Sequence, residues 1–177
     1  MRQRIVFVVG PDMCGKTEIS KALSEAMSAP RFKASSEHDT YLNHQDRFLQ
    51  QLRVIEPRMT DFLRQTGHSV IFDRGYPCEV AYSQVLKRET DWRVLGEIDA
   101  AMAEMGAHIV VCRRSSYKGI VDDIDPTTKE ERLQQLDNAY VDFSRWTRCR
   151  TLLLNVDDED LDREIEEILE WTKGHLW

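Results

Sequence analysis

The chain has 177 residues, of which 41% are hydrophobic and 31% charged, a composition typical of a soluble globular domain and not of a disordered chain. No apolar run approaches the ~18 residues that a membrane span needs, and the net charge of −7 weighs against a protein that wraps duplex nucleic acid, while leaving room for a local basic groove. Its 4 cysteines are scattered, without a C-x-x-C pair, so we expect no zinc site and no disulfide framework. We predict a single cytoplasmic domain over residues 1–177.

Strand-like and helix-like patterns alternate along the chain. Apolar runs predict five strands, over 4–9, 31–35 (the weakest), 69–73, 107–112 and 151–156. Apolar residues at helical spacing predict helices between them, over 19–27, about 43–65, 77–88, about 91–105, 130–143 and from about 158. Five strands separated by helices predict a parallel sheet covered on both faces, which is a three-layer α/β fold.

Two of the predicted helices carry more specific signals. The long second helix has Pro57 in its middle, and we expect this proline to kink the helix or break it in two, because it lacks a backbone N–H. The segment "TTKE" at 127–130 offers a capping box for the fifth helix. The apolar stripe of the second helix is formed by Phe48, Leu52, Ile55, Met59 and Phe62.

The segment after the first strand reads "GPDMCGKT" (10–17) and matches G-x-x-x-x-G-K-[ST] at every fixed position. The glycines let the backbone curl so that successive N–H groups point at phosphate oxygens, and the helix that follows adds its positive N-terminal end. Lys16 is expected to reach the β- and γ-phosphates of ATP, and the Thr17 hydroxyl to bind Mg²⁺. The predicted nucleotide contacts come from Gly10, Asp12, Met13, Cys14, Gly15, Lys16 and Thr17.

A second signal lies in "VIFDRG" (70–75), at the end of the third strand. Beside a phosphate-binding loop, Mg²⁺ needs a carboxylate at the end of a neighbouring strand, and Asp73 occupies that position. The alternative is an ordinary aspartate at a strand end. Arg74 follows directly, at the edge of the sheet where α/β proteins bind ligands, and suits bidentate recognition of a phosphate. The alternative for Arg74 is an exposed ion pair.

At these residues the sequence resembles the thymidylate kinase and deoxynucleoside kinase group of P-loop kinases, especially short, viral-type members. The resemblance implies a P-loop kinase fold with a short lid at about 113–126, and a homodimer. In thymidylate kinases an acidic residue at the second variable position of the loop helps to set the acceptor sugar, and here that residue is Asp12. The family's Asp-Arg pair after the third strand corresponds to Asp73 and Arg74, and the continuation "GYPCEVAYSQV" resembles the segment that lines the acceptor pocket.

The family also closes an arginine-rich lid over the phosphates, and some members place an arginine in the loop where this chain has Met13. Arg113 and Arg114, at the end of the fourth strand, are therefore candidates to supply charge to the transferred group; the alternative is a solvated basic turn balanced by nearby aspartates. After the second strand this chain reads "SSEHDTYLN" in place of the family's acidic-Pro-Gly segment, so Glu37 or Asp39 stands in for a base or sugar contact.

Two residues of the long second helix complete the acceptor candidates. Phe48 could stack on a base, although its place in the apolar stripe fits core packing equally well. Arg53 could meet an acceptor phosphate, and the alternative is a surface group.

We therefore expect ATP- and Mg²⁺-dependent phosphoryl transfer to a nucleoside monophosphate, a deoxypyrimidine such as dTMP. The expected catalytic residues are Lys16, Asp73, Arg74, Arg113 and Arg114. A first alternative keeps the kinase but transfers to a hydroxyl, on a deoxynucleoside or on a hydroxymethylated base in DNA, and this acceptor would need a carboxylate base. A second alternative is a nucleotide-binding regulatory module without catalysis.

Overall fold

The computed structural model describes residues 3–33, 49, 51–120 and 129–174. In these ranges the chain forms a five-stranded sheet in the order β2-β3-β1-β4-β5, with every neighbouring pair parallel. The sequence prediction of a parallel α/β sheet is confirmed. The strands are β1 (Ile5–Val9), β2 (Arg31–Lys33), β3 (Val70–Asp73), β4 (His108–Arg113) and β5 (Arg150–Asn155).

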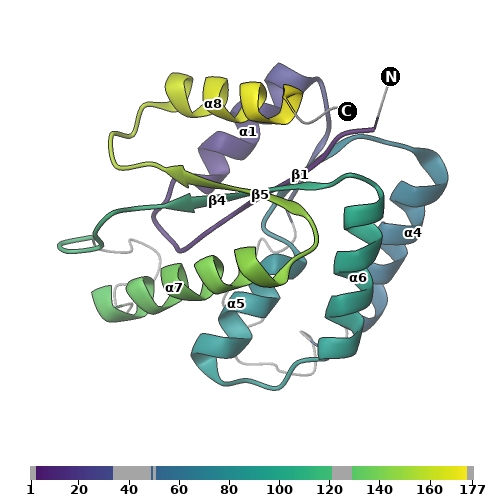
Figure 1. The fold of residues 1–177 in the computed structure, drawn as a ribbon, viewed down its shortest axis with the longest axis horizontal. Helices are drawn as coiled ribbons and strands as arrows, with labels where there is room; N and C mark the ends of the chain where they lie inside the picture. The colour runs from purple at the N-terminus through teal and green to yellow at the C-terminus, as the bar shows by residue number, and fades with distance from the viewer. Residues whose placement is uncertain (1–2, 34–48, 50, 121–128, 175–177) are drawn as a thin grey trace.

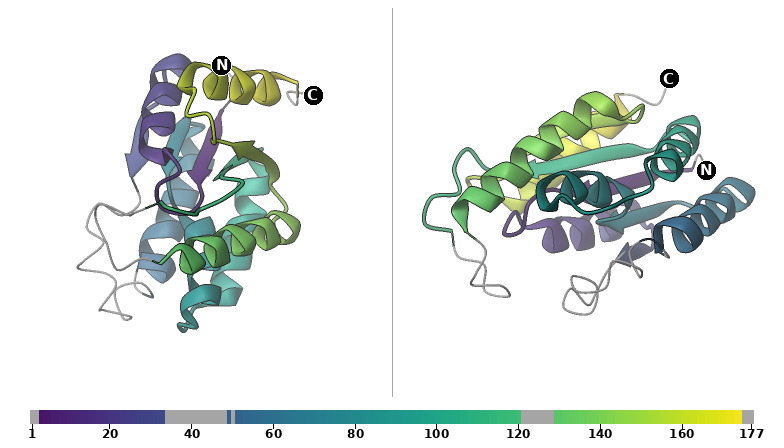
Figure 2. Two further views of the ribbon diagram at one scale, coloured as in Figure 1. Left: turned by 90° about the vertical axis from the view of Figure 1, so that its left-hand side faces the viewer. Right: turned by 90° about the horizontal axis from the view of Figure 1, so that it is seen from below.

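Helices cover both faces of this sheet. On one face lie α1 (Lys16–Met27) and α8 (Leu161–Lys173), and on the other lie α5 (Tyr76–Leu86), α6 (Trp92–Glu104) and α7 (Glu130–Trp146) (Figure 1). Seen from below, α5, α6 and α7 lie in front of the strands (Figure 2). A π-helical turn, η1 (Gln51–Ile55), leads into α4 (Glu56–Thr66), which joins the second layer of helices.

The central strand β1 supplies both cores, because successive side chains of a strand point to opposite faces. Ile5, Phe7 and Val9 belong to the core under α4–α7, whereas Val6 and Val8 belong to the core under α1 and α8. All five are at most 1% exposed, which explains why this strand reads as a continuous apolar run. The pairing of β1 with β3 also brings the rings of Phe7 and Phe72 together, stacked with centroids 4.5 Å apart.

The predicted stripe of the second helix is partly wrong, and the π-helical turn is the physical reason. Leu52 is buried as expected, but Ile55 is 48% and Phe62 49% exposed, and the buried positions of α4 are Glu56, Thr60 and Leu63. A π turn inserts one residue relative to the α-helical repeat, so the stripe read at constant spacing already leaves the core at Ile55, and Glu56 takes the buried position. Pro57 lies in the first turn of α4, where its missing N–H costs no helical hydrogen bond.

The capping box predicted at 127–130 is wrong. The helix α7 begins at Glu130, and its N-cap is Lys129 in an extended conformation, with no capping hydrogen bond from a side chain of the described residues. A box would place Glu130 at the third helical position, whereas the helix starts there.

None of the helices within the described ranges combines the length and the apolar character that crossing a bilayer requires.

Candidate active site at the P-loop edge of the sheet

The loop predicted to bind phosphate joins the carboxyl end of β1 to α1, at the edge of the sheet to which all strands point. Its first glycine is required by packing, because a Cβ on Gly10, at a φ of +141°, would overlap with the backbone carbonyl oxygen of Cys112 in β4. Farther along, Met13 and Gly15 both have left-handed backbones, with φ of +63° and +64°. A left-handed conformation is unfavourable for a methionine, and such strain gathers at functional sites. The loop thus curls tightly ahead of the free N–H groups of α1.

Lys16 is held inside this curl. Its side chain is 5% exposed; the ammonium donates to the carbonyl oxygen of Pro11 and lies 3.8 Å from Asp12 Oδ1. Burial, together with the positive charge of Arg74, lowers the pKa of Lys16 from its usual 10.5. An anionic ligand would stabilise a buried ammonium that has so few partners. Binding a phosphate in this way is the role expected for a P-loop lysine.

Asp12 connects three elements around the loop. Arg74 Nη2 donates to Asp12 Oδ1 at 2.6 Å, and the hydroxyl of Tyr82 in α5 donates to Oδ2 at 2.8 Å. Burial alone would raise the pKa of Asp12, but the charges of Lys16 and Arg74 and these hydrogen bonds hold it well below its usual value. Arg74 also has a left-handed backbone, with φ of +77°. The carboxylate of Asp12 therefore stays ionised and orients Arg74 at the edge of the loop.

Asp73, at the end of β3, lies against the start of α1. The Thr17 hydroxyl donates to Asp73 Oδ2 at 3.2 Å, and the same oxygen accepts from Arg31 Nη2 at 2.7 Å. Asp73 is 1% exposed, and its other oxygen, Oδ1, is buried without a hydrogen-bond partner among the described residues. A hydroxyl oxygen and a carboxylate with an unused buried oxygen fit Mg²⁺, which binds one or two protein oxygens and completes its shell with substrate phosphates and water.

The two arginines that end β4 go to different places. Arg113 turns toward α7 and donates through Nε and Nη2 to the buried carboxylate of Asp137, at 3.0 and 2.6 Å. Arg114 turns toward the loop, donating to the Met13 carbonyl at 3.0 Å and to Glu159 at 2.6 Å. Of the pair, Arg114 is thus the one in contact with the phosphate-binding loop.

A buried hydroxyl links this part of the chain to the loop. The Tyr117 hydroxyl donates to Asp137 Oδ1 at 3.1 Å, accepts from the Arg114 N–H at 3.3 Å and lies 3.5 Å from Cys14 Sγ. These contacts anchor the start of the predicted lid at Tyr117. The rest of the predicted lid, 121–126, lies outside the described residues.

The acceptor candidates that follow β2, including those of the predicted second helix, are not brought to the loop by any contact among the described residues. Arg53 forms an ion pair with Asp91 at 2.8 Å, with half of its side chain exposed. Glu37, Asp39 and Phe48 lie outside the described residues, so their proposed contacts stay predictions.

Sequence reasoning missed Arg31, Tyr82, Tyr117 and Asp137. Tyr82 stood in the segment "GYPCEVAYSQV" that the family resemblance had singled out, and a polar ring among apolar helix residues was the available signal. Nothing in the local sequence distinguishes Arg31 or Asp137 from surface charges, because their partners lie 42 and 24 residues away.

The comparisons with known proteins agree with this architecture. No protein-family model and no curated protein matches the sequence. Among solved structures, the YorR protein of Bacillus subtilis, in complex with phosphorylated GDP, is 17% identical with a TM-score of 0.69, over 99% of this chain and 100% of that one. A deoxyadenosine kinase from M. mycoides, with the products dCMP and dCDP, is 19% identical with a TM-score of 0.60, over 97% and 99% of the two chains.

A thymidylate kinase from Ehrlichia chaffeensis is 16% identical with a TM-score of 0.58, over 96% of this chain and 97% of that one. At such identities the likeness shows the fold alone: this chain has the three-layer α/β fold that these kinases also have, as the sequence predicted. The two kinases named here act on different acceptors by name, so the fold leaves the acceptor open.

Proposed function

We propose that this protein transfers the γ-phosphoryl group of ATP, with Mg²⁺, to a nucleoside monophosphate, specifically a deoxypyrimidine nucleotide such as dTMP. The observation that carries the proposal is the pairing of the Thr17 hydroxyl with Asp73 beside the buried ammonium of Lys16. This arrangement joins a metal-binding carboxylate to a phosphate-binding loop at one edge of the sheet, as phosphoryl transfer requires.

On the donor side, the backbone N–H groups from Met13 to Thr17 and the Lys16 ammonium would hold the phosphates of ATP. Thr17 and Asp73 would hold Mg²⁺, which when bound neutralises charge on the phosphate oxygens. A hollow of about 220 Å³ at the carboxyl ends of β4 and β5 is lined by Arg114, which also contacts the loop at Met13. This hollow would take the donor's base and sugar. Arg114, already in contact with the loop, would also stabilise the transferred group.

Arg113 needs a different account from Arg114. Because Nε and Nη2, one edge of its guanidinium, are held by the buried carboxylate of Asp137, Arg113 is directed toward α7 and not toward the loop. We therefore assign the larger catalytic effect to Arg114.

On the acceptor side, the charges favour a phosphate over a hydroxyl. Arg74 presents a guanidinium at the sheet edge, oriented by Asp12, and suits an acceptor phosphate. A hydroxyl acceptor would instead need a carboxylate base; the pKa of Asp12 is held too low for that role, and the sequence candidates Glu37 and Asp39 lie outside the described residues. The choice of a deoxypyrimidine rests on the resemblance of Asp12, Asp73 and Arg74 to the thymidylate kinase pattern.

The test is ADP release from ATP and Mg²⁺ against a panel of the four deoxynucleoside monophosphates, the deoxynucleosides and single-stranded DNA carrying hydroxymethylated bases. We expect release with dTMP or another deoxypyrimidine monophosphate, and loss of about 10²–10³-fold in Lys16→Ala, the usual cost of removing one group that stabilises transition-state charge. Lys21→Ala is the matched control, since Lys21 is an exposed lysine of the same helix paired with Glu18. Turnover of the nucleosides or the DNA, but of none of the monophosphates, would replace the proposal with the hydroxyl-acceptor alternative. Tight ATP binding without ADP release in the presence of any acceptor would favour a regulatory module.

A further inference from the structure

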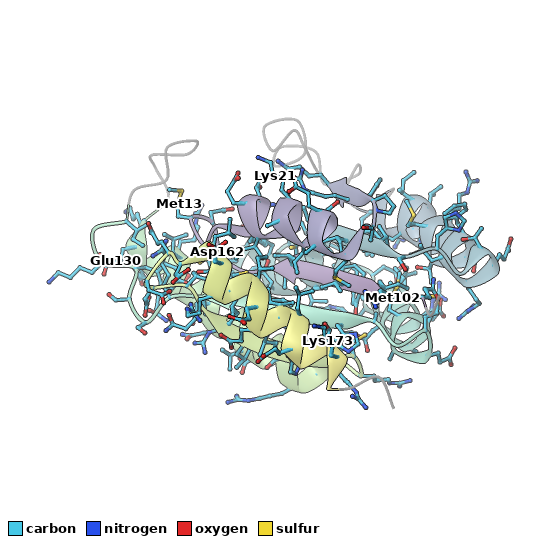
Figure 3. All side chains as sticks on the ribbon, turned by 90° about the horizontal axis from the view of Figure 1, so that it is seen from above. Met13, Lys21, Met102, Glu130, Asp162 and Lys173 are labelled. Carbon is cyan, nitrogen blue, oxygen red and sulfur yellow. The ribbon has the colours of Figure 1, made fainter. Side chains whose placement is uncertain are left out.

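A second cavity lies at the opposite end of the sheet from the P-loop. It has a volume of about 330 Å³ and is lined by residues at the amino-terminal ends of the strands, among them Arg4 before β1, His108 in β4 and Arg150 in β5, and by Met27 and Lys173 at the ends of α1 and α8. Figure 3 shows Lys173, at the C-terminal end of α8, well away from the P-loop residue Met13. A volume of this size lies at the lower limit of small-molecule sites.

The cavity is strongly cationic in a chain whose net charge is −7. Its lining includes Arg4, Arg148, Arg150 and Lys173. Of the described residues in that lining, Glu104 is the one carboxylate, and it lies 3.4 Å from Arg64. A concave surface lined by charges of one sign concentrates ligands of the other sign.

Three of these cations have no neutralising partner among the described residues. Within the described part of the chain, no hydrogen bond or ion pair is formed by the side chain of Arg4, Arg148 or Lys173. By contrast, Arg74 and Arg114 at the P-loop edge are each bound to a carboxylate. Several unpaired cations around one hollow favour a ligand group of charge −2 or more, which a phosphate supplies and a single carboxylate does not.

The walls between these charges are partly apolar. Val6, Met27 and Leu169 line the cavity together with the backbone turn that joins α6 to β4. His108 contributes an imidazole that lies nearly perpendicular to the Trp171 ring, with centroids 5.0 Å apart. Such walls suit a ligand with an organic body in addition to its anionic group, because an inorganic ion would leave them exposed to water.

We propose that this cavity is a second, separate binding site for a small phosphorylated organic molecule, a nucleoside or sugar phosphate. Its phosphate lies among Arg4, Arg148 and Lys173, and its organic body lies against the apolar wall. The site does not depend on the P-loop, and it stands whether or not the proposed kinase activity is found.

The experiment is isothermal titration calorimetry of full-length Lys16→Ala/Arg74→Gln, which weakens both the P-loop site and the proposed acceptor contact, with dTMP, ribose 5-phosphate and inorganic pyrophosphate as probes. We expect saturable binding of dTMP or ribose 5-phosphate, tighter than that of pyrophosphate. Preference for dTMP assigns a nucleoside phosphate to the cavity, and preference for ribose 5-phosphate assigns a sugar phosphate. Pyrophosphate binding as tightly as both would overturn the role of the apolar wall.

Charge reversal locates the binding. Adding Arg148→Glu to Lys16→Ala/Arg74→Gln should raise the Kd at least about tenfold, the scale of a lost charge-assisted hydrogen bond. The matched control adds Arg145→Glu, since Arg145 is an exposed arginine of α7 outside this cavity, and should leave the Kd unchanged. Equal Kd values in the two charge-reversal variants, or no binding to Lys16→Ala/Arg74→Gln by any probe, would refute the site. Thermal melts of each variant confirm that it is folded. Arg148→Gln is a milder second variant and should also raise the Kd.

Discussion

Replacing Tyr82 by phenylalanine tests whether Asp12 organises the acceptor side of the candidate site. The substitution keeps the ring and removes only the hydroxyl, which donates to Asp12 Oδ2 at 2.8 Å. Arg74 and Lys16 remain beside the carboxylate, so Asp12 stays ionised but loses the contact that ties it to α5. We expect the acceptor to bind less tightly, because Arg74 takes its direction from Asp12.

The magnitude follows from the geometry. A hydrogen bond to a charged group contributes about 1.5–3 kcal/mol, and both Tyr82 and Asp12 are only partly buried, so water restores some of the loss. We therefore expect Tyr82→Phe to lower the free energy of unfolding by about 1.5 kcal/mol, near the low end of that range. In a domain of this size the loss corresponds to a fall in Tm of about 3–6 °C.

The assay combines a thermal melt with steady-state kinetics in which the acceptor nucleotide is varied at saturating ATP. Tyr76→Phe is the matched control, because the Tyr76 hydroxyl donates to Asp99 at 2.8 Å in the core, away from the loop. Both variants should lose stability, and only Tyr82→Phe should raise the acceptor KM. A rise of the acceptor KM by the same factor in both variants, or in neither, would refute the role given to Asp12.

Three further perturbations address the loop, the metal site and a buried carboxyl. Gly10→Ala should lower the Tm and abolish nucleotide binding, because the new Cβ would overlap with a backbone carbonyl of β4. The control is Gly96→Ala, where nothing lies within 4 Å of the added Cβ, and it should be neutral or stabilising. Equal Tm values for the two variants would contradict the steric argument. Arg31→Gln removes a positive charge 2.7 Å from Asp73, a charge that competes with Mg²⁺ for the carboxylate. A lower Mg²⁺ concentration should therefore stabilise the ADP complex in a thermal melt. A higher Mg²⁺ requirement would show that Arg31 instead positions the carboxylate. Burial raises the pKa of Glu56 from 4.5 to about 7, so the folded state holds a proton that the unfolded state releases, and stability should fall by about 3 kcal/mol as pH rises from 4.5 through 7. Urea melts of the wild type against Glu56→Gln should show this difference growing between about pH 5 and about pH 8, and a constant difference would argue against a protonated Glu56.

The parts of the site that the sequence predicted are those built from neighbours in the chain. The loop from Gly10 to Thr17 takes its shape from local backbone requirements and from its place between a strand and a helix. Asp73 was found in the same way, as the polar residue that ends an apolar strand. Parallel strands end at one edge, so the meeting of Thr17 with Asp73 followed from the fold class.

The second helix shows where a periodic pattern stops being informative. Its apolar residues continue at constant spacing through Ile55 and Phe62, yet both are about half exposed. The π-helical turn at Gln51–Ile55 changes the phase of the helix, and a sequence pattern does not record such a turn, because the same residues are compatible with an unbroken α-helix.

What the sequence by itself determined is the order of strands and helices, the phosphate-binding loop and the carboxylate beside it. Tertiary structure alone decided the partner of each charged group: Arg31 on Asp73, Tyr82 on Asp12 and Arg113 on Asp137. It also gathered Arg4, Arg148 and Lys173 around one cavity from three distant segments. Local patterns fix backbone conformation because they act over one or two turns of chain, whereas charge pairing depends on distances in space that only the packed sheet and its helices set.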